Sequence, residues 1–159
     1  MPSLPELSLP AFRETHRSRI SAFDGLARSL TAWCQRARVP PATLDRLVLV
    51  LDELFSNIVI HGYTQGCEGD ILVEAQVRDR AVDVTLTDHA PAFNPLLVPK
   101  TDTTLSLEER PLGGLGLLFV RNTTDELHYE LLAPHTPEAA NSLRFTLYFQ
   151  TSASRGRLT

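Results

Sequence analysis

The sequence predicts an α+β protein, a two-layer sandwich in which helices cover one face of a mixed, mostly antiparallel β-sheet. Two long segments with helical periodicity come first, segments with strand patterning follow, and one short helical segment interrupts those strands. The length of 159 residues suits a single domain with one core. A content of 43% hydrophobic and 21% charged residues is ordinary for a globular protein.

The first half of the chain predicts an extended arm and two helices. Residues 4–12 alternate apolar and polar residues between prolines, which indicates an edge strand or an extended arm. Residues 17–38 place apolar side chains at helical spacing. The prolines at 40 and 41 end that helix, and the second of them suits the first turn of another. The second helix is expected over residues 42–63.

The second half predicts strands around one short helix. Residues 70–78 and 81–88 alternate with a period of two and are expected to form a hairpin. Residues 89–112 are rich in Pro and Thr and lack periodicity, and a segment of that length in a compact domain is usually functional. The remaining expected elements are a helix over 114–124, strands over 126–132 and 142–150, and a disordered tail over 151–159 that leaves 1–150 as the domain.

Charge and composition exclude several classes of function. The net charge is −4 with a pI of about 5.7, and no basic block indicates a direct nucleic-acid partner. Cys34 and Cys67 belong to no CxxC or Cys/His cluster, so a zinc site is not expected. The N-terminus lacks the pattern of a signal peptide, and no apolar run is long enough to span a bilayer. We therefore expect a cytoplasmic protein without a membrane partner.

The second predicted helix carries polar residues beside its core face. Glu53, Asn57 and His61 follow one another at four-residue spacing and form a ridge on the helix surface. A carboxylate and an amide in that position are candidates for a site, although solvated polar residues on an amphipathic helix would give the same pattern. His61 is a minor candidate, because a lone histidine is more often structural. The core face is expected to consist of Leu44, Leu47, Leu51, Leu54, Phe55 and Ile58.

Two further features point to a ligand. Asp88 ends a predicted strand, where its carboxylate could accept a hydrogen bond from an exocyclic amine or could cap its own turn. The stretch 110–116, RPLGGLG, precedes an apolar helical run. Glycines allow a backbone to approach a ligand closely, and a helix N-terminus offers free N–H groups to phosphate. A flexible junction between loop and helix is the alternative, and the stretch is neither a P-loop nor a Rossmann turn.

In combination and in this order, these segments resemble a known family. ELFSNIVIHGY (53–63), DHAPAFNP (88–95) and RPLGGLGLLFVRNTTDELHYE (110–130) resemble the N box, G1 box and G2 box of the GHKL ATPases. The pattern GGLGLxxVRxxxDExxY is most similar to the anti-sigma factor serine/threonine kinases of the bacterial partner-switching type. Asn141-x-Leu143 before the last strand also fits. The resemblance covers about residues 10–150 and implies the Bergerat-type ATP-binding fold.

The resemblance implies roles for individual residues. Glu53 would orient or deprotonate the attacking hydroxyl, Asn57 would bind Mg²⁺ through its amide oxygen, and Asp88 would accept a hydrogen bond from the adenine amine. Residues 96–112 would form the ATP lid. The implied nucleotide-binding residues are Asn57, Asp88, Ala90, Phe93, Arg110, Gly113, Gly114, Leu115 and Gly116.

Two positions depart from the family pattern. Ala90 stands where the G1 box has a glycine, and Asn94 stands where it has an aspartate. Ala90 adds a methyl group close to the expected adenine. It could weaken nucleotide binding modestly or require a small backbone shift.

The implied function is that of an ATP-dependent serine/threonine kinase and anti-sigma factor. The resemblance implies that it phosphorylates a STAS-domain anti-sigma factor antagonist and binds a sigma factor or comparable effector in its other state, and it is compatible with a homodimer. A non-catalytic, ATP-dependent binding module is one alternative. A detached histidine-kinase-like ATPase domain is another, against which the sequence offers no helical hairpin with a phosphoacceptor histidine.

Overall fold

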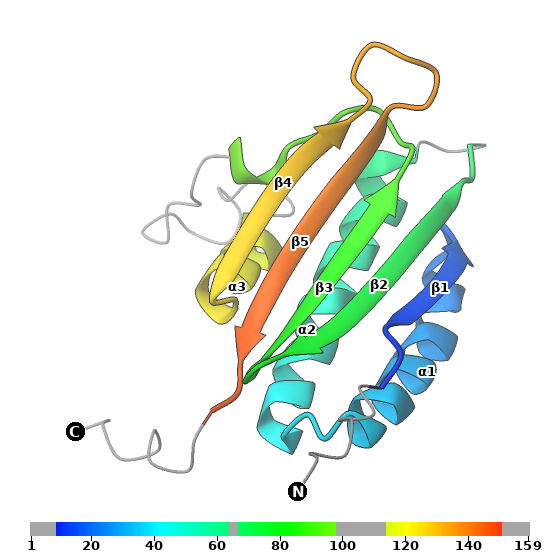
Figure 1. Cartoon of the computed structure of the whole chain (residues 1–159). Coiled ribbons are helices and arrows are strands. Elements are labelled where there is room, and N and C mark those ends of the chain that lie inside the picture. The colour runs from blue at the N-terminus through cyan, green and yellow to red at the C-terminus, as the bar shows by residue number, and fades with distance from the viewer. Residues whose placement is uncertain (1–8, 64–66, 98–113, 151–159) are drawn as a thin grey trace, which may run out of the picture.

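The computed structural model describes residues 9–63, 67–97 and 114–150 (Figure 1). Its strands form one sheet of five, in the order β1-β2-β3-β5-β4. The elements in chain order are β1 (Phe12–Arg17), a 3₁₀ turn (Ile20–Ala22), α1 (Phe23–Arg36), α2 (Pro41–Asn57), a π-helical turn (Ile58–Gly62), β2 (Asp70–Arg78), β3 (Ala81–Asp88), a second 3₁₀ turn (Pro95–Leu97), α3 (Gly114–Thr123), β4 (Glu126–Leu132) and β5 (Ala140–Tyr148).

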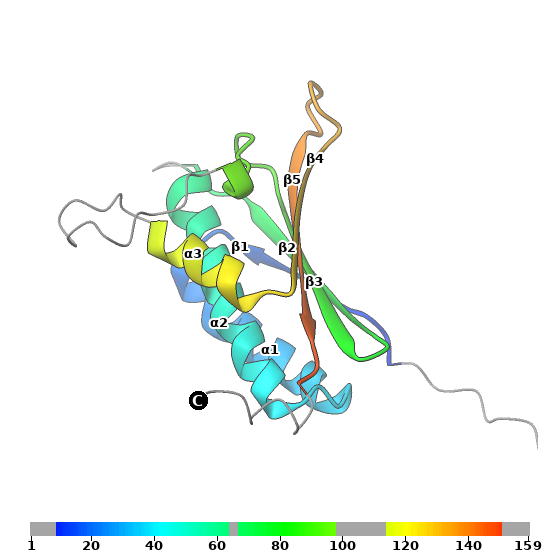
Figure 2. The same cartoon turned by 90° about the vertical axis from the view of Figure 1, so that its left-hand side faces the viewer.

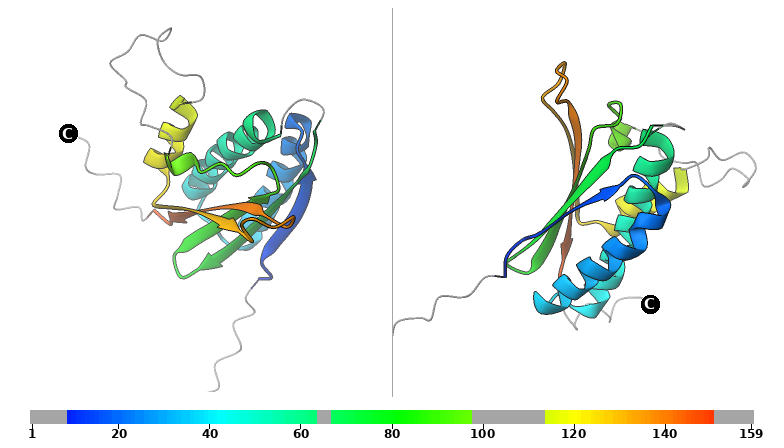
Figure 3. Two further views of the ribbon diagram at one scale, coloured as in Figure 1. Left: turned by 90° about the horizontal axis from the view of Figure 1, so that it is seen from above. Right: turned by 90° about the vertical axis from the view of Figure 1, so that its right-hand side faces the viewer.

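The architecture is the predicted two-layer sandwich. α1, α2 and α3 lie together on one face of the sheet, which Figure 2 shows edge-on and Figure 3 shows from above. In the described part of the chain all four strand pairings are antiparallel, a simpler arrangement than the mixed sheet expected. The side chains between the layers form one hydrophobic core, to which α2 contributes the fully buried Leu47, Val50, Leu51 and Phe55. Leu44 and Ile58, also predicted for this face, pack against the core while half-buried.

The N-terminal edge strand lies later in the chain than predicted. β1 spans Phe12–Arg17 instead of residues 4–12, and α1 begins at Phe23 instead of residue 17. Phe12 is the only buried residue of β1, so this edge strand shows almost no hydrophobic alternation. Charged cross-strand pairs attach it to β2 instead, including Arg17 Nη1 to Asp70 Oδ1 at 2.9 Å.

α2 and α3 pack side by side in opposite directions. Near the start of α2, Arg46 Nη2 donates to the carbonyl of Thr123 at the end of α3 at 2.6 Å. Near the end of α2, the carboxylate of Glu53 lies against Gly116 at the start of α3. Val120 of α3 is fully buried in the core between these two contacts. The register of the two helices therefore decides which α3 residue meets Glu53.

Within the described ranges, no helix has both the length and the apolar character needed to cross a bilayer.

Candidate functional site

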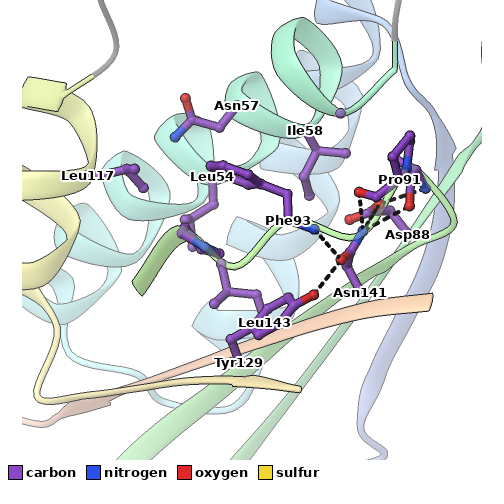
Figure 4. Close-up of a pocket in the computed structure, with 13 residues that line it drawn as sticks. Leu54, Asn57, Ile58, Asp88, Pro91, Phe93, Leu117, Tyr129, Asn141 and Leu143 are labelled. Atoms are coloured by element: carbon purple, nitrogen blue, oxygen red, sulfur yellow. Dashed lines mark hydrogen bonds between the residues drawn. The ribbon is translucent and has the colours of Figure 1, made fainter. Parts of the chain in front are cut away.

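A small cavity lies where the end of α2, the end of β3 and the loop after β3 meet (Figure 4). Its volume is about 50 Å³, and most of its lining is apolar. Asn57 and Asp88, both predicted site residues, line it from opposite elements. The full lining consists of Leu54, Asn57, Ile58, Gly62, Asp88, Ala90, Pro91, Phe93, Pro95, Leu117, Tyr129, Asn141 and Leu143.

Asp88 is a buried carboxylate whose two oxygens differ. It is 5% exposed, and burial raises the pKa of its carboxyl, while hydrogen bonds from Asn141 and Ala90 oppose that rise. Oδ1 accepts the N–H of Ala90 at 2.9 Å and the amide of Asn141 at 3.0 Å. Among the described residues, no hydrogen bond reaches Oδ2. Asp88 therefore caps its own turn with one oxygen and keeps the other as a possible acceptor.

Asn141 connects Asp88 to the loop that follows it, a role that the sequence did not predict. Its Nδ2 also donates to the carbonyls of Ala90 at 3.1 Å and Pro91 at 3.3 Å. Its Oδ1 accepts the N–H of Phe93 at 3.1 Å and the hydroxyl of Tyr129 at 2.7 Å. Asn141 and Asp88 are direct cross-strand partners of β5 and β3. Only the strand register brings these two residues together, and their separation in sequence gives no hint of it.

Asn57 has an unpartnered amide nitrogen beside the cavity. Its Nδ2 is buried and has no hydrogen-bond partner among the described residues. In Figure 4 this nitrogen points toward Leu54 and Leu117, and the amide oxygen points away from them. Leaving a polar atom unpaired in such a place costs free energy, so the amide suits a site completed by a ligand.

The oxygen of the same amide is the atom predicted to bind Mg²⁺. Mg²⁺ keeps several waters and usually takes one or two protein oxygens together with substrate phosphates. The described part of the chain holds no group of three or more His, Cys, Asp or Glu side chains placed to bind a metal. The amide oxygen of Asn57 is a ligand of the type that Mg²⁺ accepts, and its role as a magnesium ligand stays a prediction.

The helix changes geometry directly after Asn57. Residues Ile58–Gly62 form a π-helical turn, closed by a hydrogen bond from the Tyr63 N–H to the carbonyl of Ile58 at 3.1 Å. Such turns occur often at functional sites. A side chain at Gly62 would begin 3.1 Å from the Cβ of Ala90, so the missing side chain leaves room for the Ala90 methyl. The departure from the family glycine is thus accommodated by a glycine on the facing element.

Glu53 lies one turn before Asn57 and outside the apolar cavity. Its carboxylate fills the space in front of Gly116, so that a side chain at position 116 would collide with it. The structure thereby brings the predicted catalytic residue and a predicted glycine of the nucleotide site into direct contact. A larger side chain at position 116 would require the Glu53 carboxylate to move.

The structure describes some of the other predicted residues, and the rest lie outside the described ranges. Phe93 and Leu115 are 51% and 45% exposed, Phe93 lines the cavity, and Gly114 begins α3. His61, the minor candidate, is exposed and does not line the cavity. Arg110, Gly113 and most of the predicted lid lie outside the described residues. The roles assigned to all of these residues remain predictions.

Comparisons with known proteins identify similar chains. Residues 17–146 match the family model described as a histidine kinase-like ATPase domain. The anti-sigma F factor of Bacillus subtilis (strain 168) is 25% identical over 138 residues, which cover 85% of this chain and 90% of that protein. A sensor histidine kinase component, HK1 of Mycobacterium tuberculosis (strain ATCC 25618 / H37Rv), is 31% identical over 107 residues, or 65% of this chain and 61% of that one.

A kinase and a solved structure are similar as well. The serine/threonine-protein kinase BtrW of Bordetella bronchiseptica is 30% identical over 84 residues, covering 53% of this chain and 59% of BtrW. The crystal structure of the RsbU and RsbW domains of Rv1364c from Mycobacterium tuberculosis superposes with a TM-score of 0.59 at 17% identity. It covers 88% of this chain, which spans 32% of that longer chain, and at this identity the likeness concerns the fold alone.

Proposed function

Because the chain belongs to the family of histidine kinase-like ATPase domains, we propose that it is an ATP-dependent protein serine/threonine kinase that also acts as an anti-sigma factor. Its substrate is a serine or threonine hydroxyl on a STAS-domain antagonist. Its other partner is a sigma factor or a comparable effector. The match to an anti-sigma F factor covers 90% of that protein, which supports a function of the same kind.

One observation carries the proposal. Residues of α2, β3 and α3 lie close together although they are far apart in sequence. Asp88 and Asn57 line the same cavity, and Glu53, one helical turn from Asn57, lies against Gly116 of α3. With Asp88 as nucleobase acceptor, Asn57 as metal ligand and Glu53 as the carboxylate beside α3, the site would have the parts that phosphoryl transfer needs.

Each of these residues has a distinct task in the proposed reaction. Asp88 accepts a hydrogen bond from the adenine amine, and Asn57 holds Mg²⁺, which when bound neutralises charge on the phosphates. The hydroxyl oxygen of the antagonist bonds to the γ-phosphorus, and the bond from that phosphorus to the bridging oxygen of ADP breaks. Glu53 orients the hydroxyl and takes its proton. The nucleophile comes from the partner, so this chain needs no catalytic Ser or Cys.

Transfer of label tests the proposal. Purified protein is incubated with Mg²⁺, γ-labelled ATP and a STAS-domain antagonist encoded near its gene. We expect label on a serine or threonine of the antagonist, and none when Ala replaces that residue. Bound ATP without transfer to any antagonist would contradict the kinase assignment.

A non-catalytic ATP-dependent binding module is the second candidate, and one observation favours it. The cavity is small, about 50 Å³, and Ala90 adds a methyl to its lining. Such a module would capture its effector in an ATP-dependent manner without turnover. Pull-down with ATP and with a non-hydrolysable analogue separates the two, because only a kinase would release the antagonist in phosphorylated form.

The remaining partner assignments extend the same proposal. We propose a cytoplasmic protein that forms a homodimer, as the sequence resemblance to the partner-switching kinases suggests. Sedimentation of the purified chain checks the oligomeric state independently of the kinase assay.

A further inference from the structure

Asn141 uses its whole hydrogen-bonding capacity inside the protein. It is 7% exposed, and it joins β5 to β3, to β4 and to the loop after β3. Its nitrogen faces three acceptors, namely Asp88 Oδ1 and the carbonyls of Ala90 and Pro91. Its oxygen faces two donors, the N–H of Phe93 and the hydroxyl of Tyr129. No group of Asn141 is left over to bind a ligand itself.

These neighbours fix the orientation of the amide. If the amide were turned over, its oxygen would face a carboxylate and two carbonyls, and its nitrogen would face an N–H. The observed orientation is therefore the only one that pairs every group. The Asn141 nitrogen and the Ala90 N–H both bind Oδ1, so Oδ2 is the oxygen of Asp88 that has no hydrogen-bond partner among the described residues, and Asp88 lines the cavity.

We propose that Asn141 is a positioning residue that presents Oδ2 of Asp88 as an ionised acceptor, and thereby sets the preference of the site for a 6-amino over a 6-oxo purine. The inference rests on the proposed ATP binding and adds to it the residue that determines base selectivity. A held, charged acceptor favours an exocyclic amine and disfavours a carbonyl, because two acceptors facing each other leave both unpaired.

The charge of Asp88 depends on this contact. Burial raises the pKa of its carboxyl, and the hydrogen bond from Asn141 is the strongest influence that lowers it again. The other titratable groups that interact with it are His89, which also lowers its pKa, and the hydroxyls of Tyr63 and Tyr129. The pKa values of both tyrosines are raised mainly by burial and further by Asp88. Loss of the Asn141 donor should therefore shift Asp88 toward its protonated form.

Asn141→Asp is the sharpest test, because it keeps the shape and turns the donor into an acceptor. Two carboxylates about 3 Å apart resist ionising together, so they share a proton at lower pH. With the proton between them, the hydroxyl of the introduced carboxyl group again donates to Asp88. We expect Mg-ATP affinity to fall roughly tenfold at pH 8, the equivalent of one charge-assisted hydrogen bond, and the ratio of variant to wild-type Kd to shrink toward pH 5.5.

The experiment measures Kd for Mg-ATP and for Mg-ITP, whose base carries a 6-oxo group, by calorimetry from pH 5.5 to 8.5. Ser142→Asp is the matched control, because it adds the same charge at the next position of β5, on the opposite face of the sheet. Asn141→Ala removes the donor without adding charge, and it should lower the ATP-to-ITP preference several-fold at every pH. If the Asn141→Asp variant does not fold, the Asn141→Ala variant tests the proposed role of Asn141 by itself.

The outcomes separate this inference from the proposed function. If the wild-type protein binds neither nucleotide, the proposed ATP binding fails and the inference fails with it. If the wild type prefers ATP while both Asn141 variants keep its selectivity, only the inference is overturned. A loss of affinity that is equal for both nucleotides and independent of pH would also overturn it, since a merely structural defect gives that result.

Discussion

The two oxygens of Asp88 have different roles: Oδ1 holds the structure, and Oδ2 is the proposed acceptor for the ligand. Oδ1 is held by the Ala90 N–H and by Asn141, while no hydrogen bond from the described residues reaches Oδ2. An amide placed at position 88 would meet the same two donors. Its oxygen would have to take the place of Oδ1, which puts its NH₂ group where Oδ2 was. An asparagine at position 88 would therefore present a donor to the ligand where the aspartate presents an acceptor.

Asp88→Asn should weaken ATP binding and reverse the preference between ATP and GTP. The lost interaction is a charge-assisted hydrogen bond, which contributes roughly 1.5–3 kcal/mol. The NH₂ group now at the ligand side would suit the 6-oxo group of guanine. Competition calorimetry with both nucleotides measures the change. An unchanged preference for ATP would show that Asp88 does not contact the base.

Glu53→Gln should separate nucleotide binding from chemistry. The amide keeps the shape that fits against Gly116 but cannot take a proton. Mg-ATP should bind as in the wild type, and phosphorylation of the antagonist should fall on the order of 10²–10⁴-fold, the usual contribution of a positioned base. Glu53→Ala should give the same loss.

Asp52→Asn is the matched control for Glu53. Asp52 precedes it on α2, is exposed, and accepts a hydrogen bond from Ser56 at 3.3 Å. This variant should phosphorylate at the wild-type rate. If the folded Glu53→Gln protein does so as well, the proton is taken by another group.

Individual candidate residues could be identified from the sequence where they belong to a short local motif. Glu53, Asn57 and Asp88 stand in motifs whose spacing is short, and the structure places Asn57 and Asp88 on one cavity. Asn141 and Tyr129 were not predicted as part of the site. Their role depends on the register of β5 with β3 and β4, which no local pattern encodes.

At the scale of elements, the contact between α2 and α3 is the one that the site depends on. A side chain at position 116 would collide with the end of the Glu53 side chain and not with backbone. The long glutamate side chain can turn away at little cost in stability, but the carboxylate then leaves its place. A side chain added at position 116 should therefore cost little stability but should displace the Glu53 carboxylate.

Gly116→Ala should therefore reduce catalysis more than stability. We expect a thermal midpoint within a few degrees of the wild type, because no core contact is lost. Phosphorylation should fall at least tenfold. Thermal denaturation and the transfer assay, run on the same preparation, check this. A large fall in the midpoint would mean that α3 itself is displaced.

The π-helical turn and the loop after β3 fit together through Gly62 and Ala90. A methyl at position 62 would lie 3.1 Å from the Ala90 Cβ, and the hydrogen bonds of Asp88 and Asn141 hold Ala90 in place. Gly62→Ala should destabilise the fold by about 1 kcal/mol instead of giving the usual helical gain. The double variant with Ala90→Gly should recover most of that loss. Additive effects in the thermal double-mutant cycle would contradict a direct contact.

Elements with a strong hydrophobic pattern were predictable, and the weakly patterned one was not. The β2–β3 hairpin appears at the predicted residues, and α2 begins within one residue of its predicted start. β1 was misplaced because charged pairs hold it at the sheet edge. The 3₁₀ turn at Ile20–Ala22 continues the helical spacing, which made α1 look longer than it is.

At the scale of the whole molecule, the ionised carboxylate that the site needs reduces the stability of the fold. Burial raises the pKa of Asp88. A carboxyl with a raised pKa in the folded state stabilises the fold below its unfolded pKa of roughly 3.9, and that stabilisation is lost as the pH rises through the folded pKa. At neutral pH the ionised Asp88 therefore lowers the stability of the ligand-free protein.

Asp88→Asn should accordingly raise the thermal midpoint of the ligand-free protein at pH 7. The gain should shrink as the pH falls toward the unfolded pKa of roughly 3.9, because the wild-type carboxyl then takes up its proton in the folded state. Differential scanning calorimetry of both proteins from pH 4 to 8 measures it, and comparing the two proteins cancels the other titrating groups. A gain that stays constant with pH would not come from this charge.

The fold class as a whole followed from the order of helical and alternating segments, because each layer must bury its apolar face against the other. The arrangement of the strands within the sheet did not follow. β5 lies between β3 and β4, so the chain passes from β3 through α3 to the edge strand β4 before it returns. Hydrophobic alternation indicates that a strand exists and not which neighbour it pairs with.

The clamping of α3 has a mechanical consequence. Arg46 holds its last residue by the carbonyl of Thr123, and Arg121 ties its second half to the carbonyls of Pro95 and Leu96. A rod fixed near one end moves furthest at the other. Gly116 lies roughly 10 Å along the axis from Thr123, so a tilt of about 10° would move it by about 2 Å. A tilt of α3 about its C-terminal end would therefore displace Gly116 from the Glu53 carboxylate while the contacts of Thr123 and Arg121 persist.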